Sequence, residues 1–422
     1  MTAEPGHPSG GDIFRQGDQA YELEERIAVG GFSRVYRARA LDTDEHVVVK
    51  YPRPRHSGLD SEVYLDRELR ALRTVAAAGG HPSLLGYRDH FTADGTTFIV
   101  VDYIEGETLD DTPYIGDEET IRTFGVKLAS GVAALHRFGL IYRDMKPDNI
   151  IVTDDGAPML VDFNTVRCRF QCSECGASVT QDAATEPTCH ECGHAPGPIT
   201  MVGDADKNRC KAPEQENPAL APGPWTDVYG LGKILFLLVC GFITQAPGED
   251  PREQPEIQCS SSLAEIILRA TAADPAERYE HAGALGQALA ANDPRPPAAT
   301  AVIRELESDT TYEVSDGDSI GRVGGSAVTV PSPPSDTGVS RQHARFVREG
   351  GPWFLEDTSL NGTLLDRNDE QHLLLSARGQ QAHDIERAVP TRRMLLAGDQ
   401  IYPGTDASRG GFRFEGDHWT KG

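Results

Sequence analysis

Four cysteines in the middle of the chain have the spacing of metal ligands. Cys172 and Cys175 form one C-x-x-C pair, and after thirteen intervening residues Cys189 and Cys192 form a second. Four thiolates spaced in this way can surround one Zn²⁺ tetrahedrally, so the spacing predicts a structural zinc site. A redox dithiol pair, or replacement of one thiolate by a neighbouring histidine, would use the same stretch of sequence. Clustered cysteines in a chain with no sign of secretion are more often metal ligands than disulfides.

Charged and amide side chains suited to a nucleotide recur along residues 21–290. VVVK places Lys50 on a strand, where its charge can bind phosphate oxygens, and Glu68 follows eighteen residues later in a helical stretch. IYRDMKPDNI (141–150) and VDFN (161–164) then supply carboxylates, a lysine and an asparagine. Phosphoryl transfer depends on positioning and charge stabilisation more than on covalent chemistry, so this set of side chains could serve it.

In this order, the motifs resemble those of a eukaryotic-type protein kinase domain. The resemblance implies that Asp144 accepts or orients the proton of a substrate hydroxyl and that Lys146 neutralises the transferring phosphoryl group. It also implies that Asn149 and Asp162 bind Mg²⁺ and that ATP is the phosphoryl donor. Glu68 would orient Lys50 as its ion-pair partner. The residues implied in ATP binding are Val29, Gly30, Val35, Lys50, Glu68, Asp102 and Tyr103.

Several positions depart from the kinase pattern. Ala28 and Ser33 replace two glycines of the phosphate loop, and Tyr142 replaces the histidine of the catalytic loop. Asn164 stands for the glycine of D-F-G, and because asparagine is among the few other residues that tolerate positive φ, the substitution is compatible with activity. The threonine that usually precedes A-P-E is missing, since residues 207–211 have the sequence KNRCK.

A second group of kinase-like motifs favours a protein substrate. Ala212–Pro213–Glu214 matches A-P-E, and Asp227 stands where the family uses an aspartate to hold the catalytic loop. Arg278, in DPAERY, occupies the position that pairs with the glutamate of A-P-E. We therefore expect a serine/threonine protein kinase. A pseudokinase scaffold that binds nucleotide and phosphoproteins is the alternative that the departures motivate, and a small-molecule kinase is disfavoured by these three motifs.

The cysteine motif resembles a zinc ribbon inserted at residues 168–196. This insertion lies inside the activation segment, which runs from Asp162 to Glu214. A module this small could not form a core unaided, so zinc would supply its folding energy. We hypothesise that zinc gives the activation segment a fixed shape; the alternative is a knob that docks partners without affecting catalysis.

Residues 301–416 carry a third set of motifs. They are Gly321-Arg322, Ser340-Arg341-Gln342-His343, DTSLNGT (357–363) and Gly398-Asp399. Together they resemble a forkhead-associated (FHA) domain, a β-sandwich that binds phosphothreonine peptides. Leu360 stands where that family often has a hydroxyl residue, so one phosphate contact is expected to be missing, and His343 would brace the loop. The residues implied in phosphopeptide binding are Arg322, Ser340, Arg341, Ser359 and Asn361. Such a domain would recruit phosphorylated proteins or a phosphorylated segment of the same chain.

The composition limits the choice of partners. The net charge is −25, from 40 basic and 65 acidic residues, which argues against nucleic acid or an anionic membrane as a general partner. Neither a bilayer-spanning apolar run nor a signal-peptide pattern in residues 1–20 is found, so we expect a cytoplasmic protein. A lysine-poor acidic composition is typical of salt-adapted proteins, although an ordinary acidic protein would share it.

Together, these resemblances imply a multidomain chain: an α+β bilobal protein-kinase fold with an inserted zinc ribbon, followed by an all-β FHA sandwich. Residues 1–20 are expected to be a disordered tail, 21–290 the kinase domain, 291–300 a Pro/Ala linker and 301–416 the FHA domain. Strands are expected within 21–50 and at TTFIVVDYI (96–104), and helices at 60–77, 118–138, 226–239, 262–272 and 281–290.

Overall fold

The computed structural model divides the chain into two compact units, residues 1–296 and 297–422. It describes residues 10–16, 19–29, 32–53, 61–93, 95–112, 116–168, 209–216, 222–254, 257–295, 300–322, 326–330, 338–348, 353–367, 370–385, 389–395, 398–405 and 410–417. Within these ranges, no helix has the length and apolar character needed to cross a membrane.

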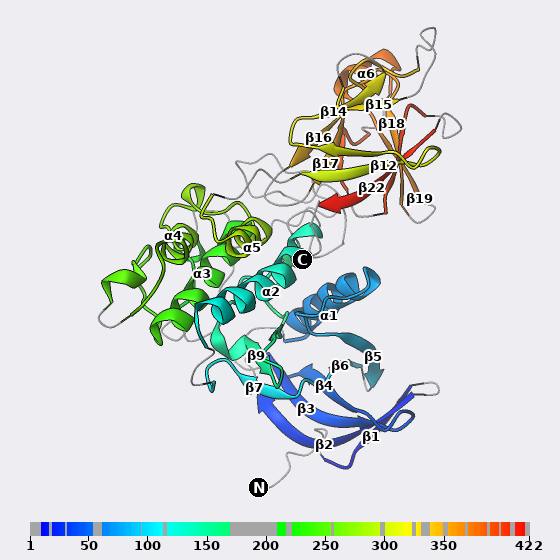
Figure 1. Cartoon of the computed structure of the whole chain (residues 1–422). Coiled ribbons are helices and arrows are strands. Elements are labelled where there is room, and N and C mark those ends of the chain that lie inside the picture. The colour runs from blue at the N-terminus through cyan, green and yellow to red at the C-terminus, as the bar shows by residue number, and fades with distance from the viewer. Residues whose placement is uncertain are drawn as a thin grey trace. The chain divides into compact units, whose positions relative to one another are not determined.

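A six-stranded antiparallel sheet and one helix form the first lobe of unit 1 (Figure 1). The strand order is β1-β2-β3-β4-β6-β5. Helix α1 (Ser61–Ala77) buries Leu65, Leu69 and Leu72, which lie on one face of the helix. The strands expected within residues 21–50 and at 96–104 and the helix expected at 60–77 are confirmed, whereas the sequence did not predict β1 or β5. The strands are β1 (Ile13–Gln16), β2 (Gln19–Val29), β3 (Ser33–Ala40), β4 (His46–Pro52), β5 (Tyr87–Ala93) and β6 (Thr96–Asp102).

Both faces of this sheet are buried, which explains the continuous apolar runs of its central strands. Val48 of β4 faces the main core with α1, whereas Val47 and Val49 face a second cluster that includes Phe91 and Phe98. Successive side chains of a strand point to opposite faces, so a strand buried on both sides needs an unbroken run such as VVV. This double burial fixes Lys50, the next residue of β4, on the core side.

Strand β1 differs from the expectation of a disordered tail. It pairs with the beginning of β2, and the Phe14 ring lies 4.8 Å from the Phe98 ring and 5.4 Å from the Phe91 ring, centroid to centroid. The expectation was wrong for this strand because its anchoring contacts come from residues more than seventy positions away, which composition alone does not reveal.

Four helices build the second lobe of unit 1. The expected helices are confirmed, and α3 is buried over most of its circumference, which explains its nearly uniform apolar sequence. Helix α3 packs against α2, α4 and α5, and the Asp117 carboxylate caps the beginning of α2 by accepting a hydrogen bond from the Thr120 amide. The helices are α2 (Glu118–Arg137), α3 (Pro224–Cys240), α4 (Ser261–Ala270) and α5 (Ala282–Ala291).

Short strands and single 3₁₀ turns lie in the connecting segments of this lobe. The sheet β10-β9-β7 holds the segment that separates the two predicted catalytic motifs, because β9 follows residues 141–149 and β10 precedes residues 161–164. The strands are β7 (Gly106–Thr108), β8 (Leu140–Ile141), β9 (Ile150–Thr153), β10 (Pro158–Leu160) and β11 (Arg167–Cys168). The 3₁₀ turns are Pro147–Asn149, Pro213–Gln215, Pro251–Glu253 and Pro275–Glu277.

Unit 2 contains two sheets around a separate core. One sheet has the order β13-β12-β22-β21-β18-β19 and the other β15-β14-β16-β17-β20. The all-β prediction is confirmed, but the sequence did not predict β15, β19, β20, β22 or the helix α6 (Ala377–Ala382). The strands are β12 (Ala301–Glu305), β13 (Thr311–Val314), β14 (Ser319–Arg322), β15 (Val328–Val330), β16 (Ala344–Arg348), β17 (Trp353–Asp357), β18 (Thr363–Arg367), β19 (Glu370–Leu374), β20 (Arg392–Met394), β21 (Gln400–Pro403) and β22 (Phe412–Asp417).

Candidate functional sites

A buried ion pair joins the first lobe to the VDFN motif. The Lys50 ammonium lies 2.6 Å from Glu68 Oε1, and the two residues are 6% and 0% exposed. The amide of Phe163 also approaches Glu68 Oε1, at 3.3 Å. Glu68 therefore connects β4, α1 and the corner of the activation segment, which is the arrangement that the order of the motifs predicts.

Opposed charges set the protonation of this cluster. Burial would lower the pKa of Lys50, but the charges of Glu68 and Asp162 outweigh it and raise that pKa. Burial raises the pKa of Asp162 to about 6, with further raising by Glu68 and Asp144 and lowering by Lys50 and Lys146. The half-buried Asp162 carboxylate would be stabilised by a cation, and its oxygens together with the side-chain oxygen of Asn149 are the kind of donors that Mg²⁺ prefers.

The catalytic-loop residues form a compact hydrogen-bonded group. Lys146 Nζ donates to Asp144 Oδ2 at 2.8 Å, and the Asn149 amide donates to the same oxygen and to the Asp144 carbonyl, each at 2.9 Å. Burial lowers the pKa of Lys146, but Asp144 more than compensates and raises it. The three predicted catalytic residues are thus brought together by direct contacts.

Asp227 fixes the backbone of the catalytic loop through its carboxylate. Its two carboxylate oxygens accept hydrogen bonds from the amides of Tyr142 (2.8 Å) and Arg143 (2.7 Å). His136 Nε2 lies 2.8 Å from Asp227 Oδ2, and the Ala282 amide donates to His136 Nδ1 at 3.3 Å, so the Nε2–H tautomer fits the site. All of these groups are buried, so their loss would leave unpaired polar atoms.

Tyr142 forms contacts of its own at the histidine position. Its hydroxyl donates to the Val161 carbonyl at 2.5 Å, and its ring packs edge-on to Phe163 with centroids 5.8 Å apart. The substitution therefore links the catalytic loop to the strand end before Asp162.

The VDFN corner places its left-handed residue at Asp162. Among the described residues near this corner, Arg143 (φ 74°) and Asp162 (φ 63°) have positive φ, and Asn164 does not. Aspartate also tolerates the left-handed region, and the Asn164 amide approaches Asp162 Oδ1 at 3.4 Å, which supports the turn. The tolerance of asparagine for positive φ is therefore not used at residue 164.

The A-P-E segment is fixed by a fully buried ion pair. Arg278 binds Glu214 through two nitrogens, at 2.8 and 3.0 Å, with both side chains completely buried. Thr226 Oγ1 donates to Glu214 at 2.8 Å, and Gln215 Nε2 donates to the Arg143 carbonyl at 2.9 Å. The segment therefore contacts both α3 and the catalytic loop.

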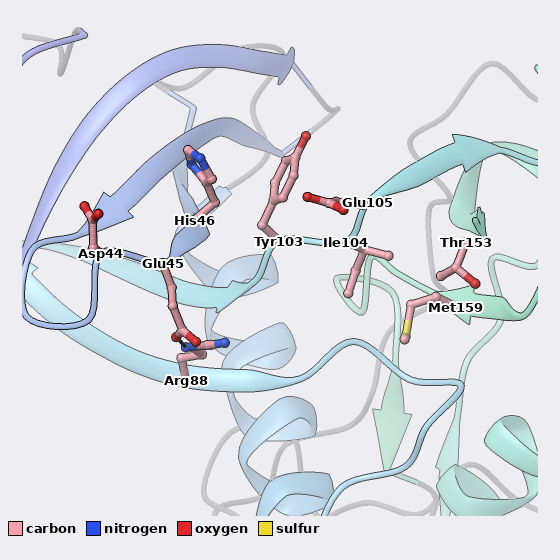
Figure 2. A pocket seen from close by; sticks show the side chains of 9 residues that line it. All are labelled: Asp44, Glu45, His46, Arg88, Tyr103, Ile104, Glu105, Thr153 and Met159. Carbon is pink, nitrogen blue, oxygen red and sulfur yellow. Dashed lines mark hydrogen bonds and ion pairs between the residues drawn. The ribbon is translucent and has the colours of Figure 1, made fainter. Parts of the chain in front are cut away.

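The other residues implied in ATP binding have surroundings that differ from those of the buried Lys50–Glu68 pair. Val35 packs against the main core, Val29 is 48% exposed, and Gly30 lies outside the described residues. The Asp102 carboxylate accepts a hydrogen bond from Arg88 Nε at 2.5 Å. Tyr103 lines a pocket of about 520 Å³ that Lys50 and Asp162 do not line (Figure 2). The other residues of this pocket are Asp44, Glu45, His46, Arg88, Ile104, Glu105, Thr153 and Met159.

The predicted zinc ligands lie outside the described residues, as does most of the 168–196 insertion. In the part of the chain that is described, no group of three or more His, Cys, Asp or Glu side chains is placed to hold a metal ion. Cys210, just before A-P-E, is buried, and burial raises the pKa of its thiol to about 12.

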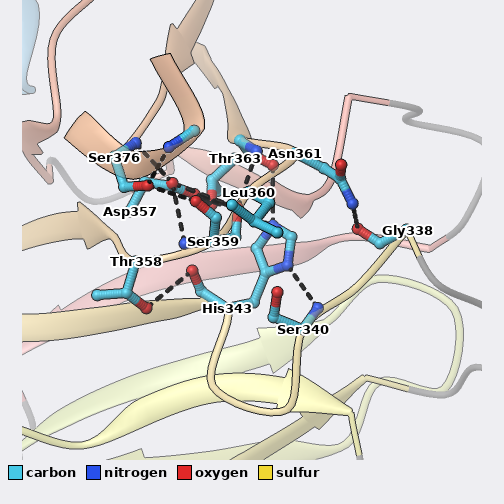
Figure 3. A network of polar contacts seen from close by, with 12 residues as sticks. Gly338, Ser340, His343, Asp357, Thr358, Ser359, Leu360, Asn361, Thr363 and Ser376 are labelled. Carbon is cyan, nitrogen blue, oxygen red and sulfur yellow. Dashed lines mark hydrogen bonds and ion pairs between the residues drawn. The ribbon is translucent and has the colours of Figure 1, made fainter. Parts of the chain in front are cut away.

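Two motifs of unit 2, residues 340–343 and residues 357–363, meet in one hydrogen-bonded network (Figure 3). The buried His343 ring accepts the Ser340 amide at Nδ1 (3.0 Å) and approaches the Gly362 carbonyl through Nε2 (2.8 Å). Burial lowers the pKa of His343 despite the opposing effects of Gly362 and Asp357. The side-chain amide of Asn361 donates to the Gly338 carbonyl at 3.0 Å. The backbone amide of Arg322 donates to the Ser340 carbonyl at 3.1 Å. Arg341 is exposed.

Ser359 does not face the surface as a phosphopeptide ligand would. It is 2% exposed, and its hydroxyl donates to Asp357 Oδ2 at 3.0 Å. The Ser359 hydroxyl oxygen also accepts a hydrogen bond from the backbone amide of Gly362 at 2.8 Å. Its hydroxyl is needed inside the loop, where it satisfies the buried Asp357 carboxylate. Leu360, which follows it, is 38% exposed.

Sequence reasoning missed several residues that support these sites. His136, Thr226, Gln215 and Ser376 each form a hydrogen bond to a residue of a predicted motif. Only His136 left a signal in the sequence, because it is a polar residue beside the apolar stripe of a helical stretch. The others lie in loops or at helix beginnings, where polar residues are common.

The fold and the two sites define a protein kinase domain followed by an FHA domain. Residues 21–186 match the family model of the protein kinase domain, and residues 319–379 match that of the FHA domain. The chain therefore contains both domains in the expected order.

Related proteins are serine/threonine-protein kinases of bacteria. PknB of Mycolicibacterium smegmatis is 28% identical over 348 residues, which cover 78% of this chain and 51% of PknB. PknL of Mycobacterium tuberculosis is 29% identical over 295 residues (65% of this chain, 66% of PknL). A probable serine/threonine-protein kinase of Clostridium perfringens is 28% identical over 287 residues (62% of this chain, 36% of that protein). The aligned parts thus span about a third to two thirds of these relatives.

Proposed function

We propose that this chain is an ATP-dependent serine/threonine protein kinase whose FHA domain binds phosphothreonine. The observation that carries the proposal is the continuous set of contacts from the Lys50–Glu68 pair to the catalytic loop. A scaffold that only binds nucleotide has no need of a substrate-hydroxyl base held by Lys146 and Asn149.

Each residue of this set has a role that its position suits. ATP with Mg²⁺ would supply the γ-phosphoryl group, with Asn149 and Asp162 as the residues that hold the metal. Lys50 would bind phosphate oxygens, and Glu68 would orient it. Asp144 would accept or orient the proton of the substrate hydroxyl, while Lys146 stabilises charge on the transferred group.

The substrate class follows from the A-P-E segment. The buried Glu214–Arg278 pair and the Gln215 contact hold this segment against the catalytic loop. A firmly held segment beside Asp144, the proposed base, suits the binding of an extended protein chain as substrate. We therefore favour serine or threonine in proteins as the phosphate acceptor.

Transfer of label from γ-labelled MgATP tests this activity. Purified chain is incubated with generic protein substrates beside an Asp144→Asn variant, which keeps the size of the side chain. Label on protein that the variant loses is the expected result. Nucleotide binding with no label on any protein would favour the pseudokinase scaffold.

The FHA domain would recruit phosphorylated proteins or a phosphorylated segment of the same chain. Arg322 and the exposed Arg341 offer positive charge for a phosphate, with Ser340 beside them, and Asn361 lies in the same network. Pull-down with a phosphothreonine peptide pool, against its unphosphorylated form, tests the proposal. Equal retention of the two pools would contradict it.

The cysteines of the activation segment would bind one structural Zn²⁺ and form a zinc ribbon. The support is their spacing alone. Elemental analysis of the purified chain should find one zinc per chain, lost in a Cys172→Ser/Cys175→Ser variant and retained in Cys259→Ser. If the ribbon orders the segment, zinc removal should lower kinase activity while the unfolding transition of the FHA domain stays in place. Unchanged kinase turnover after verified removal of zinc would contradict this ordering role and leave only the docking of partners as a role for the ribbon.

The net charge of −25 suggests a cytoplasm of high ionic strength and partners other than nucleic acid or membranes. Salt would screen the self-repulsion of such a chain, so its unfolding temperature should rise with KCl concentration. A salt-independent unfolding temperature would contradict this adaptation.

A further inference from the structure

An inserted segment packs against the loop that carries the FHA motif. We call residues 375–385, which include α6, the α6 segment, and residues 358–362 the recognition loop. The sequence offered no role for the long connection between residues 366 and 392. Its contacts give it one, and the inference rests on the proposed phosphothreonine binding.

Ser376 makes two contacts to the base of the recognition loop. Its amide donates to Asp357 Oδ1 at 2.9 Å, and its hydroxyl donates to the Ser359 carbonyl. The same hydroxyl accepts the Gly379 amide at 3.0 Å, which caps the beginning of α6. One side chain therefore fixes both the helix and the loop.

A second contact reaches the exposed part of the loop. His383 Nε2 lies 3.0 Å from the Leu360 carbonyl, within hydrogen-bond distance. Gly379 passes so close that a Cβ atom at this position would lie 2.9 Å from the same carbonyl oxygen. Any larger residue at 379 would push the loop or the helix away, so glycine is required for this packing.

The recognition loop is thus held from two sides. On the inner side, Asp357 binds the Ser359 hydroxyl and the Thr363 hydroxyl, and His343 contacts the Gly362 carbonyl. On the outer side, the α6 segment contacts the carbonyls of Ser359 and Leu360. Between these supports, Leu360 and Asn361 occupy the outward part of the loop.

We propose that the α6 segment is the outer support of the recognition loop, and that Ser376 and His383 are positioning residues which raise affinity for phosphothreonine peptides. A loop ordered before binding costs less conformational entropy when the ligand binds. Loss of one of these supports should therefore weaken phosphopeptide binding without removing any residue that touches the peptide.

The test uses the full chain and four variants. Ser376→Ala removes the hydroxyl, Ser376→Thr retains it, and His383→Ala removes the second contact. Ser308→Ala is the matched control, since that hydroxyl bonds only within its own turn, to Glu305 and Thr310. Binding of a fluorescent degenerate phosphothreonine peptide pool is measured by anisotropy. Amide hydrogen exchange is measured on fragments that contain residues 358–363.

The expected result is binding about 3- to 10-fold weaker for Ser376→Ala, with recovery in Ser376→Thr and no change in Ser308→Ala. Exchange at residues 358–363 should rise in Ser376→Ala and His383→Ala while the strands of unit 2 keep their protection. Unchanged exchange in the loop, or unchanged affinity with raised exchange, would overturn the inference. Failure of the wild-type chain to prefer the phosphorylated pool would instead overturn the proposed FHA function, and the exchange data would still decide whether the segment supports the loop.

Discussion

The kinase site and the recognition loop are both proposed to handle phosphate, but they place their charges differently. In the kinase site, Lys50 and Glu68 are buried and lie in the field of Asp162. In the FHA domain, the arginines proposed to meet phosphate are half-buried or exposed, and the buried part is a carboxylate bonded to amides and hydroxyls.

This difference follows from what each site would have to do. Charges that stabilise a transferring phosphoryl group act most strongly where water is excluded and where they need no rearrangement. A domain that binds and releases a phosphopeptide needs accessible positive charge on a firm backbone, since full burial of its arginines would cost desolvation. The first site therefore pairs a buried lysine with a buried glutamate, whereas the second keeps its arginines accessible on a loop held by hydrogen bonds to a buried carboxylate.

The largest expected effect comes from breaking the buried pair in the kinase site. Lys50→Met should lower phosphotransfer at least about 100-fold, because the phosphate loses its cationic partner. It should also destabilise unit 1 by about 3–5 kcal/mol, since Glu68 is left buried and unpaired. Kinase assays and calorimetry measure both effects.

A double variant separates these two consequences. Adding Glu68→Leu to Lys50→Met should restore much of the stability but none of the activity. The exposed Lys127→Met serves as the control and should change neither. Recovery of activity in the double variant would show that the pair is structural only.

A comparable loss of stability is expected at the A-P-E segment. Arg278→Met leaves Glu214 buried without its partner and should cost about 3–5 kcal/mol in the unfolding of unit 1. Arg252→Met, which breaks a surface pair with Asp250, should have little effect. Calorimetry on the full chain should show the shift in one transition, whereas equal shifts in both transitions would contradict two independently folded units.

Substitution of an arginine that is proposed to bind phosphate should change phosphopeptide binding and leave kinase activity unchanged. Arg322→Ala should weaken phosphothreonine-peptide binding by about 10-fold or more, as expected for a charge-assisted hydrogen bond. Transfer of phosphate to a generic protein should be unchanged. Arg304→Ala, which breaks surface pairs with Asp309 and Glu415, is the matched control. A parallel loss of kinase activity in Arg322→Ala would mean that the two sites are coupled.

The smallest expected effect is a pH dependence of stability in unit 1. Burial lowers the pKa of His81 to about 4, and the Ser83 amide donates to His81 Nδ1 at 3.1 Å, so the folded state favours the neutral ring. The unfolded chain takes up the proton first, near its ordinary pKa of about 6.5, so stability should fall as pH decreases from 6.5 to 4. Urea unfolding of His81→Gln should show a weaker fall over this range. An identical pH profile in the variant would contradict the assignment.

Sequence alone predicted what depends on order and periodicity. The helices of unit 1, the strands β2 to β4 and the pairing of Lys50 with Glu68 follow from motifs whose spacing is fixed by the fold. It failed where the outcome depends on distant contacts. Phe14 anchors β1 through rings at residues 91 and 98, and the α6 segment is explained only by its contacts with residues 357–360.

Side-chain direction in loops was the other source of error. The motif DTSLNGT does not reveal that the Ser359 hydroxyl points to Asp357. That direction depends on which buried group needs a partner, and the packed structure decides it. The zinc ligands remain a prediction from spacing.

Phosphoamino-acid analysis of the reaction product tests the central claim most directly. After incubation with labelled MgATP, the wild-type chain should place label on serine or threonine of a protein, and Asp144→Asn should place none above background. Label that persists in Asp144→Asn, or bound ATP with no phosphoserine or phosphothreonine formed, would contradict the account.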